Sequence, residues 1–255
     1  MADWMAATGR PEEAEKAYCQ VLSFFEKYVA DYPSMLKYRR NVASTRSKQI
    51  RLLKAAGRSQ DVENAYRQAI DFYAKLAGQS PNEPDFWQEL AQAHYQLGEW
   101  EKAVTAFSKV IELKPDSASS RNSLAWLLAT SPEPKARNSV RAVDLAKKAV
   151  ELAPHEGTYW NSLGVAQYRA GNLEAARAAL EKSMELRNGG DGLDWFFLAM
   201  THWELGEKVE ASKRYGQAVT WLEKNQPNNG ELRRFRAEAQ ELMGVTAKPR
   251  EKSKN

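Results

Sequence analysis

The sequence predicts an all-α protein built from repeated helical hairpins, and three observations lead to this prediction. The composition is dominated by Ala, Leu, Glu, Lys, Arg and Gln, which all favour helices. Strand-like runs of Val, Ile and Thr are absent. Glycines that each follow a helix-periodic segment and open a short turn recur along the chain, at Gly9, Gly57, Gly98, Gly171 and Gly206.

A fixed pattern of packing residues surrounds these glycines. Five residues after each glycine stands an Ala or Val, and four residues further on a larger residue: Ala14 and Tyr18, Val62 and Tyr66, Ala103 and Phe107, Ala176 and Leu180, Ala211 and Tyr215. Three glycines are also preceded by a Trp, a Leu and a small residue at spacings i, i+3 and i+4: Trp87, Leu90 and Ala91; Trp160, Leu163 and Gly164; Trp195, Leu198 and Ala199. These spacings place each set on one helical face, where the small residue lets the next helix approach closely.

This pattern resembles the tetratricopeptide (TPR) signature, in which Trp, Leu, a small residue, Ala, an aromatic and a closing proline recur about every 34 residues. Pro115 and Pro154 stand where the closing proline belongs. The resemblance implies a right-handed α-solenoid with a C-terminal capping helix. Each hairpin leaves an apolar flank open, so neighbouring repeats must stack to cover it.

The expected organisation is one array over residues 1–243, followed by a basic tail, 244–255, that lacks periodicity and is expected to be disordered. The repeats lie at about 1–30 (partial), 34–80, 84–116, 118–155, 157–190 and 192–225, and the capping helix at 229–243. The repeat at 34–80 departs from the pattern. Its long first helix, from about Ser34 to Ala56, has Arg46 where Trp is expected and Gln49 where Leu is expected.

A second, finer resemblance covers three stretches between Leu127 and Gly171. They look like the TPR tails of large planctomycete proteins, in which a serine/threonine kinase often precedes the array. No Gly-rich loop, H-R-D or D-F-G motif is present here. The resemblance implies that the chain is the interaction arm of a larger signalling protein.

Catalytic, cofactor and metal chemistry find no support in the sequence. It has no Walker loop, no Rossmann glycine fingerprint and no H-E-x-x-H. The single cysteine, Cys19, excludes a disulfide framework within one chain and fits a cytoplasmic protein. His94 and His202 share one repeat position and are expected to be core residues. No signal peptide or membrane-spanning run is present. We therefore expect no enzyme, no cofactor, no bound metal and no membrane partner.

The TPR resemblance also implies which residues bind a ligand, because first helices line the concave surface in this family. Carried over position by position, it gives a peptide-binding set from the repeats after residue 80: Gln88, Gln92, Tyr95, Asn122, Trp126, Asn161, Tyr168, Arg169 and Trp203. Asn side chains can pair with a peptide backbone, and the aromatic residues offer apolar contact area. These residues predict a scaffold that binds a protein or peptide.

A basic segment, 37–58, adds Arg51 and Lys54 to this set. It carries eight basic residues and no acidic one: Lys37, Arg39, Arg40, Arg46, Lys48, Arg51, Lys54 and Arg58. Such a block needs solvent or an anionic partner, so we expect an acidic partner segment. A fused catalytic domain is the other expected partner, and it is implied by the planctomycete resemblance. Nucleic-acid binding through this helix is the alternative. The net charge of only +4 and the lack of interleaved aromatics argue against it.

Overall fold

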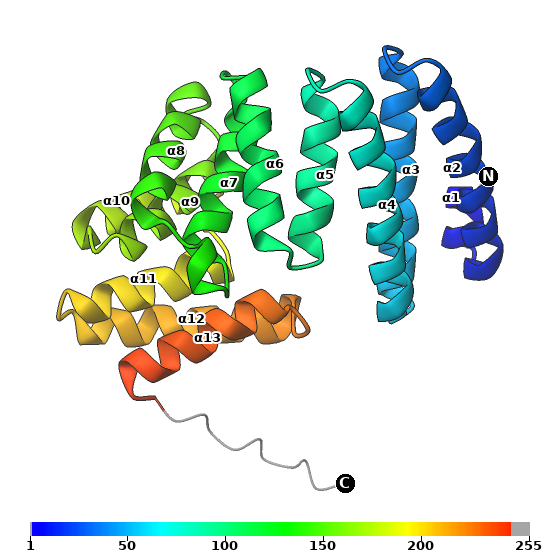
Figure 1. Cartoon of the computed structure of the whole chain (residues 1–255). Coiled ribbons are helices and arrows are strands. Elements are labelled where there is room, and N and C mark those ends of the chain that lie inside the picture. The colour runs from blue at the N-terminus through cyan, green and yellow to red at the C-terminus, as the bar shows by residue number, and fades with distance from the viewer. Residues whose placement is uncertain (1, 246–255) are drawn as a thin grey trace, which may run out of the picture. The chain divides into compact units, whose positions relative to one another are not determined.

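The computed structural model describes residues 2–245, which contain thirteen α-helices, one 3-10 turn and no strand (Figure 1). The helices are α1 (Ala2–Ala7), α2 (Pro11–Asp31), α3 (Leu36–Ala55), α4 (Ser59–Gln79), α5 (Pro84–Gln96), α6 (Trp100–Leu113), α7 (Ala118–Thr130), α8 (Ser139–Leu152), α9 (Gly157–Arg169), α10 (Leu173–Leu186), α11 (Gly192–Glu204), α12 (Lys208–Asn225) and α13 (Gly230–Met243), with the 3-10 turn η1 at Pro134–Ala136. The predicted all-α class is confirmed. Most of the tail expected to be disordered, 246–255, lies outside the described residues.

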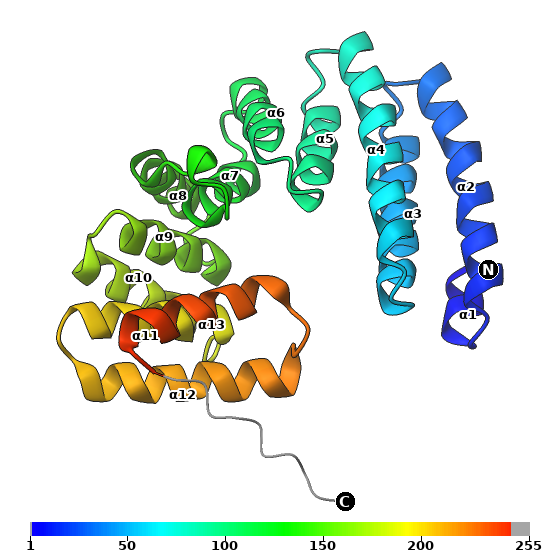
Figure 2. The ribbon, with the colours of Figure 1, turned by 60° about the horizontal axis from the view of Figure 1, so that its bottom comes forward.

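The helices form two compact units, divided between Pro115 and Asp116, and each unit is described by itself. The N-terminal unit contains α1 to α6 and the C-terminal unit α7 to α13. Helices that follow each other in the chain pair as hairpins within each unit, as Figure 2 shows for α9 with α10 and for α11 with α12. None of the helices in residues 2–245 has both the length and the apolar character needed to cross a bilayer.

The recurring glycines end the first helix of each hairpin in the same way. Their φ angles all lie between 69° and 84°: Gly9, Gly57, Gly98, Gly171 and Gly206. This left-handed conformation has little steric cost for glycine, because glycine has no side chain. At Gly98 the amide donates to the Tyr95 carbonyl at 3.1 Å, and the next amide donates to the His94 carbonyl at 2.9 Å. This is the Schellman arrangement, which satisfies the last carbonyls of a helix and reverses the chain.

Close packing within a hairpin depends on the small residue of the pattern. A Cβ atom at Gly164 of α9 would lie 2.5 Å from Leu180 Cγ and 3.1 Å from the Leu180 backbone nitrogen of α10. Ala91 and Ala199, at the equivalent positions of α5 and α11, are completely buried. The second helix of each of these hairpins therefore approaches nearly to backbone contact.

We expect Gly164→Ala to lower the free energy of unfolding by about 1–2 kcal/mol, although alanine is the better helix former. The added methyl group would press on the α10 backbone, which cannot move aside as a side chain can. Gly216→Ala in α12 is the matched control, because no atom lies within 4 Å of its added Cβ, and we expect a gain of about 0.5–1 kcal/mol. Urea unfolding followed by circular dichroism measures both. A stabilised Gly164→Ala variant would contradict this packing.

The α3–α4 hairpin is built differently. Ile50 occupies the position held by Ala91, Gly164 and Ala199 in other repeats. It is buried and clusters with Leu53 and with Ala65 of α4 near the turn that joins the two helices. Elsewhere α3 packs mainly against α2. The repeat with a large residue at this position is also the one that borders a pocket lined by α3, α4 and α5.

Polar contacts replace the missing Trp and Leu of α3. Arg46 is 6% exposed, pairs with Glu26 of α2 and donates to the Ala65 carbonyl at 3.3 Å. Gln49 is 7% exposed, and its Nε2 donates to Cys19 Sγ at 3.3 Å. The elongated repeat is thus held to α2 by a polar network.

Candidate functional site

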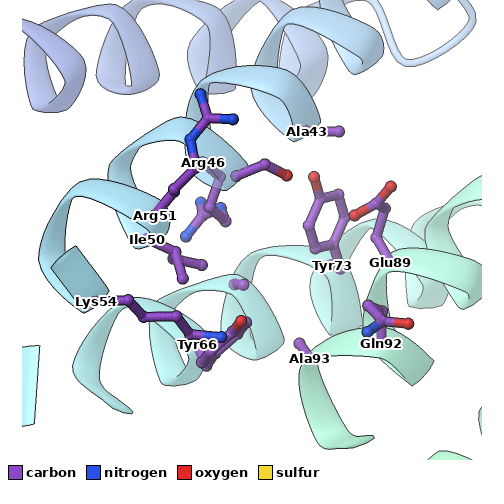
Figure 3. Close-up of a pocket in the computed structure, with 12 residues that line it drawn as sticks. Ala43, Arg46, Ile50, Arg51, Lys54, Tyr66, Tyr73, Glu89, Gln92 and Ala93 are labelled. Atoms are coloured by element: carbon purple, nitrogen blue, oxygen red, sulfur yellow. The ribbon is translucent and has the colours of Figure 1, made fainter. Parts of the chain in front are cut away.

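A pocket of about 390 Å³ lies where α3 stands away from α4 and α5. Figure 3 shows α3 side chains, among them Ile50, Arg51 and Lys54, on one side and Tyr73 and Glu89 on the other. A second pocket of about 270 Å³ shares Ala43, Tyr73 and Glu89 with the first and extends to Arg39, Arg40 and Gln88. Because of these shared residues, the two pockets adjoin each other, and we call them together the α3–α5 hollow.

The floor of the α3–α5 hollow contains a polar atom without a partner. Tyr73 is 3% exposed, and its hydroxyl makes no hydrogen bond to the described residues. Burial raises the pKa of Tyr73, so the hydroxyl stays protonated and can donate a hydrogen bond. The pKa of Glu89 is raised mainly by burial and, to a smaller extent, by the negative charge of Asp85. A ligand that accepts a hydrogen bond would satisfy the Tyr73 hydroxyl.

The basic segment 37–58, which comprises α3 and the turn after it as far as Arg58, supplies the charge of the hollow, but ion pairs neutralise four of its eight basic side chains. Four of its basic side chains form ion pairs with other helices or turns: Arg39 with Glu83 and Asp85, Arg46 with Glu26, Lys48 with Asp3, and Arg58 with Glu15 and Asp61. The ion pairs within residues 2–245 leave Lys37, Arg40, Arg51 and Lys54 without acidic partners. Lys54 instead donates to Gln96 Oε1 at 3.3 Å and lies 5.5 Å from the Tyr66 ring centre. The unpaired Arg40, Arg51 and Lys54 line the hollow.

The structure brings four of the five residues expected in the N-terminal unit to this hollow. Arg51, Lys54 and Gln92 line the larger pocket, and Gln88 lines the smaller one. Tyr95 does not line either pocket and packs edge-to-face on Trp100, with ring centres 5.4 Å apart. Sequence reasoning missed Tyr73 and Glu89. The signal that could have located the hollow is the large Ile50 at a position where other repeats have Ala or Gly.

In the C-terminal unit, two expected residues contact the last helix, α13. Trp126 Nε1 of α7 donates to Glu231 at 3.1 Å, and Arg169 of α9 forms a two-pronged ion pair with Glu238. Phe235 lies between the Trp126 and Phe197 rings, with centres 6.2 and 4.8 Å away. These side chains, expected to meet a ligand, meet a segment of the same chain.

The other expected residues of this unit are also engaged or covered. Asn161 is 4% exposed and donates to Asp194 at 2.7 Å. The Tyr168 hydroxyl donates to Glu204 at 2.9 Å, and the Lys208 ammonium lies 3.4 Å from the Trp203 ring centre. Asn122 is half-buried, and its Oδ1 has no hydrogen-bond partner in the described residues. Asn161 therefore presents no free amide at a surface, contrary to the sequence expectation.

No group of three or more His, Cys, Asp or Glu residues in the described part of the chain is placed to hold a metal ion. His94 and His202 are buried, as expected, and their Nδ1 atoms lie 2.6 and 2.5 Å from Glu99 and Glu207 across the hairpin turns. These contacts tie the end of a first helix to the turn that follows it. Their role in the fold is structural.

Two family models described as tetratricopeptide repeats match the chain, over residues 63–127 and 135–191. The chain has no match among curated proteins. Among solved structures it is similar to MamA, residues 41 to the end, from Desulfovibrio magneticus RS-1, with a TM-score of 0.56, 18% identity, and 69% of this chain and 97% of that chain covered.

Two further solved structures are similar at comparable levels. YrrB, described as a TPR protein with an unusual peptide-binding site, gives a TM-score of 0.56 at 15% identity, with 82% of this chain and 96% of that chain covered. TTC0263, a thermophilic TPR protein of Thermus thermophilus, gives a TM-score of 0.52 at 18% identity, with 76% of this chain and 98% of that chain covered. These likenesses support an all-α solenoid.

Proposed function

Because the chain contains tetratricopeptide repeats, we propose that it is a non-catalytic protein-interaction scaffold that binds an acidic, extended segment of a partner in the α3–α5 hollow. The observation that carries this proposal is the hollow itself, with the unpaired Arg40, Arg51 and Lys54 at its sides and an unpartnered tyrosine hydroxyl in its floor. Carboxylates of the segment would meet the basic groups, and a backbone carbonyl would accept from Tyr73.

The apolar part of the hollow gives the segment a second requirement. Ala43, Ile50, Ala69 and Ala93 contribute apolar lining next to the charged residues. A short apolar side chain of the partner, placed between its acidic residues, would fill this space. Its transfer out of water would favour binding. An extended segment suits this geometry because its side chains point alternately to opposite faces.

The neutralised part of the basic helix favours a peptide over nucleic acid. A duplex is bound through many phosphate contacts, and here four of eight basic side chains already have acidic partners. The remaining four can serve a short acidic segment. Nucleic-acid binding is retained as one outcome of the experiment below.

Two finer parts of the proposal rest on the sequence. The similarity of the stretches between Leu127 and Gly171 to planctomycete arrays supports a docking arm of a larger signalling protein. The single cysteine supports a cytoplasmic location. Purification of the endogenous protein, followed by its intact mass and its subcellular fraction, tests both.

We expect Arg51→Glu/Lys54→Glu to weaken binding of a labelled peptide of alternating glutamate and leucine about tenfold. Each exposed ion pair is worth about 0–1 kcal/mol, and reversal adds repulsion of similar size. Fluorescence anisotropy at low and physiological ionic strength measures the affinity. The matched control is Lys147→Glu/Lys148→Glu, which makes the same change in net charge on exposed residues of α8 and should leave the affinity unchanged.

Other arms of this experiment separate the alternatives. Tyr73→Phe should weaken peptide binding about two- to tenfold without loss of stability, because it removes a buried hydroxyl that has no partner in the free protein. Tighter binding to a duplex DNA than to the peptide would favour the nucleic-acid alternative. Equal losses in both double variants would show that only net charge matters and would contradict the hollow as the site.

A further inference from the structure

The first hairpin of the N-terminal unit exposes more apolar surface than the rest of the described chain. Nine large apolar side chains are exposed in residues 2–245, and five of them lie between residues 4 and 35: Trp4, Val21, Phe24, Tyr32 and Met35. Single exposed apolar residues are normal on a protein surface, but a cluster of them marks an interaction surface. Four of the five lie on α1, on α2 or directly after α2, so the cluster follows this hairpin.

A continuous apolar stripe runs along α2, and we call it the α2 flank. It consists of Ala17, Val21, Phe24 and Tyr28, whose spacings of four, three and four residues place them on one face of the helix. Phe24 is 55% exposed and Val21 is 37% exposed, while Ala17 and Tyr28 are half-buried. The Phe24 and Tyr28 ring centres lie 4.6 Å apart. The stripe is thus an ordered aromatic and aliphatic surface open to solvent.

The two neighbours of α2 leave most of this stripe uncovered. The helix α1 has only six residues and lies beside one end of α2 (Figure 1), where the Tyr18 hydroxyl donates to Asp3 at 2.7 Å. The helix α3 meets α2 through Glu26 and Cys19. Helical spacing places these two residues on the side of α2 opposite Phe24. The flank therefore continues, without cover from α1 or α3, beyond the end of α2 that α1 contacts.

The sizes of the four stripe residues fit an antiparallel copy of the same helix. Alternating spacings of four and three residues are typical of a seam between two helices. In an antiparallel pair with a twofold axis, Ala17 lies opposite Tyr28 and Val21 lies opposite Phe24, so each ring meets a smaller side chain. A parallel pair would place Tyr28 against Tyr28 and leave Ala17 against Ala17. The stripe is therefore self-complementary only in the antiparallel register.

The charges beside the stripe favour the same register. Lys16, Gln20, Lys27 and Asp31 are exposed and border the stripe on one side. A twofold axis brings this side of one helix next to the same side of the other, so Lys16 faces Asp31 of the second copy and Lys27 faces Gln20. Within residues 2–245, neither Lys16 nor Asp31 has an ion-pair partner. The antiparallel register supplies both with one, whereas a parallel pair would oppose like charges.

We propose that the α2 flank is a self-association surface, which takes the α2 flank of a second copy of this chain in antiparallel register. The two stripes remove each other from water, and a Lys16–Asp31 pair at each end selects the register. Because the same surface is used by both copies, the contact closes as a dimer. The flank shares no residue with the α3–α5 hollow, so the inference goes beyond the proposed peptide binding, and a dimer carries two hollows.

The first test is the mass of the full chain in solution, measured by sedimentation velocity over a range of micromolar concentrations. The mass should rise with concentration from that of one chain to that of two. Phe24→Ala should raise the dissociation constant of the dimer about a hundredfold, because one substitution removes both rings from the centre of the interface. Val140→Ala is the matched control, since Val140 is 71% exposed on α8, and it should leave the dissociation constant unchanged. Circular dichroism checks that both variants keep their helices.

A charge exchange tests the register. Lys16→Asp alone places two carboxylates opposite each other at both ends of the interface, and Asp31→Lys alone places two ammonium groups there. Each single variant should raise the dissociation constant about tenfold, because an exposed pair is lost and replaced by repulsion in two places. The double variant Lys16→Asp/Asp31→Lys restores opposite charges and should dimerise nearly as the wild type does. A parallel pair could not be rescued in this way, because position 16 would face position 16.

Three results would overturn the proposal. The first is a wild-type chain that stays monomeric at every concentration, and the second is a dimer that Phe24→Ala does not weaken. The third is a folded double charge variant that dimerises as poorly as the single variants, which would exclude the antiparallel register. Because peptide binding by the α3–α5 hollow is measured with variants of α3, failure of the dimer and failure of the hollow are separate outcomes.

Discussion

Phe235→Ala should lower the free energy of unfolding of the C-terminal unit by about 3–5 kcal/mol, as for other large-to-small changes of a fully buried aromatic residue. The ring has no exposed surface and lies edge-to-face with Phe197, with ring centres 4.8 Å apart. Its removal leaves a cavity among rings from α7 and α11, which helix backbones prevent from collapsing.

Thermal and urea unfolding of the full chain, followed by far-ultraviolet circular dichroism, measures this loss. Val209→Ala is the control, because its side chain is 86% exposed on α12, and we expect it to change the stability by about 0.5 kcal/mol or less. A loss below about 1 kcal/mol for Phe235→Ala would mean that the ring does not fill a rigid core.

Arg187→Met should also destabilise the protein strongly, by about 2–4 kcal/mol at neutral pH. Asp194 is completely buried and pairs with Arg187, while Asn161 Nδ2 donates to it at 2.7 Å and the Asp191 amide at 3.1 Å. Loss of one partner of a fully buried pair costs about 3–5 kcal/mol, and the range is lowered here because Arg187 is 22% exposed.

The pH dependence gives this second prediction a distinctive signature. Burial already raises the pKa of Asp194 despite the opposing charge of Arg187, and removal of that charge raises it further. A carboxyl group whose pKa is higher in the folded than in the unfolded state contributes its full stability below the unfolded pKa of about 3.9 and loses it as the pH rises. The deficit of Arg187→Met should therefore shrink toward pH 4.

Denaturant unfolding at pH 4 and pH 7 measures this difference. The double variant Arg187→Met/Asp194→Asn should recover part of the stability at pH 7, because no buried charge remains. A deficit that is the same at both pH values would show that Arg187 acts by packing rather than through its charge.

The fold could be predicted from the sequence because its determinants are local. The spacing of Gly98, Ala103 and Phe107 specifies a helix end, a turn and the packing face of the next helix within ten residues. Gly164 and Ala199 mark, in the same way, where two helices come close. Such short-range periodicity is sufficient to identify the hairpins.

The polar partners could not be predicted, because they come from distant parts of the chain. Asn161 was expected to face a ligand, but its side-chain amide donates a hydrogen bond to Asp194, 33 residues away. Trp126 meets Glu231, 105 residues away. Helical periodicity shows which face a side chain occupies, but it does not show which residue lies opposite.

The charge available for a ligand on α3 could not be predicted from its own residues, for a related reason. The segment 37–58 has no acidic residue of its own, and this predicted that it needs solvent or an anionic partner. The compensating carboxylates, such as Glu26 and Glu15, come from the preceding helix. Only the side chains without such partners, among them Arg51, remain for a ligand.

The isoleucine in place of Ala or Gly on α3 suggests a simple way to find ligand sites in other arrays of this kind. When aligned repeats nearly always have Ala or Gly at the position of close helix approach, one repeat with a branched residue there marks a gap in the stack. Ile50 is such a residue, and it lines the larger pocket. A survey of the residue at this one repeat position, across the sequences of many repeat arrays, would locate such hollows.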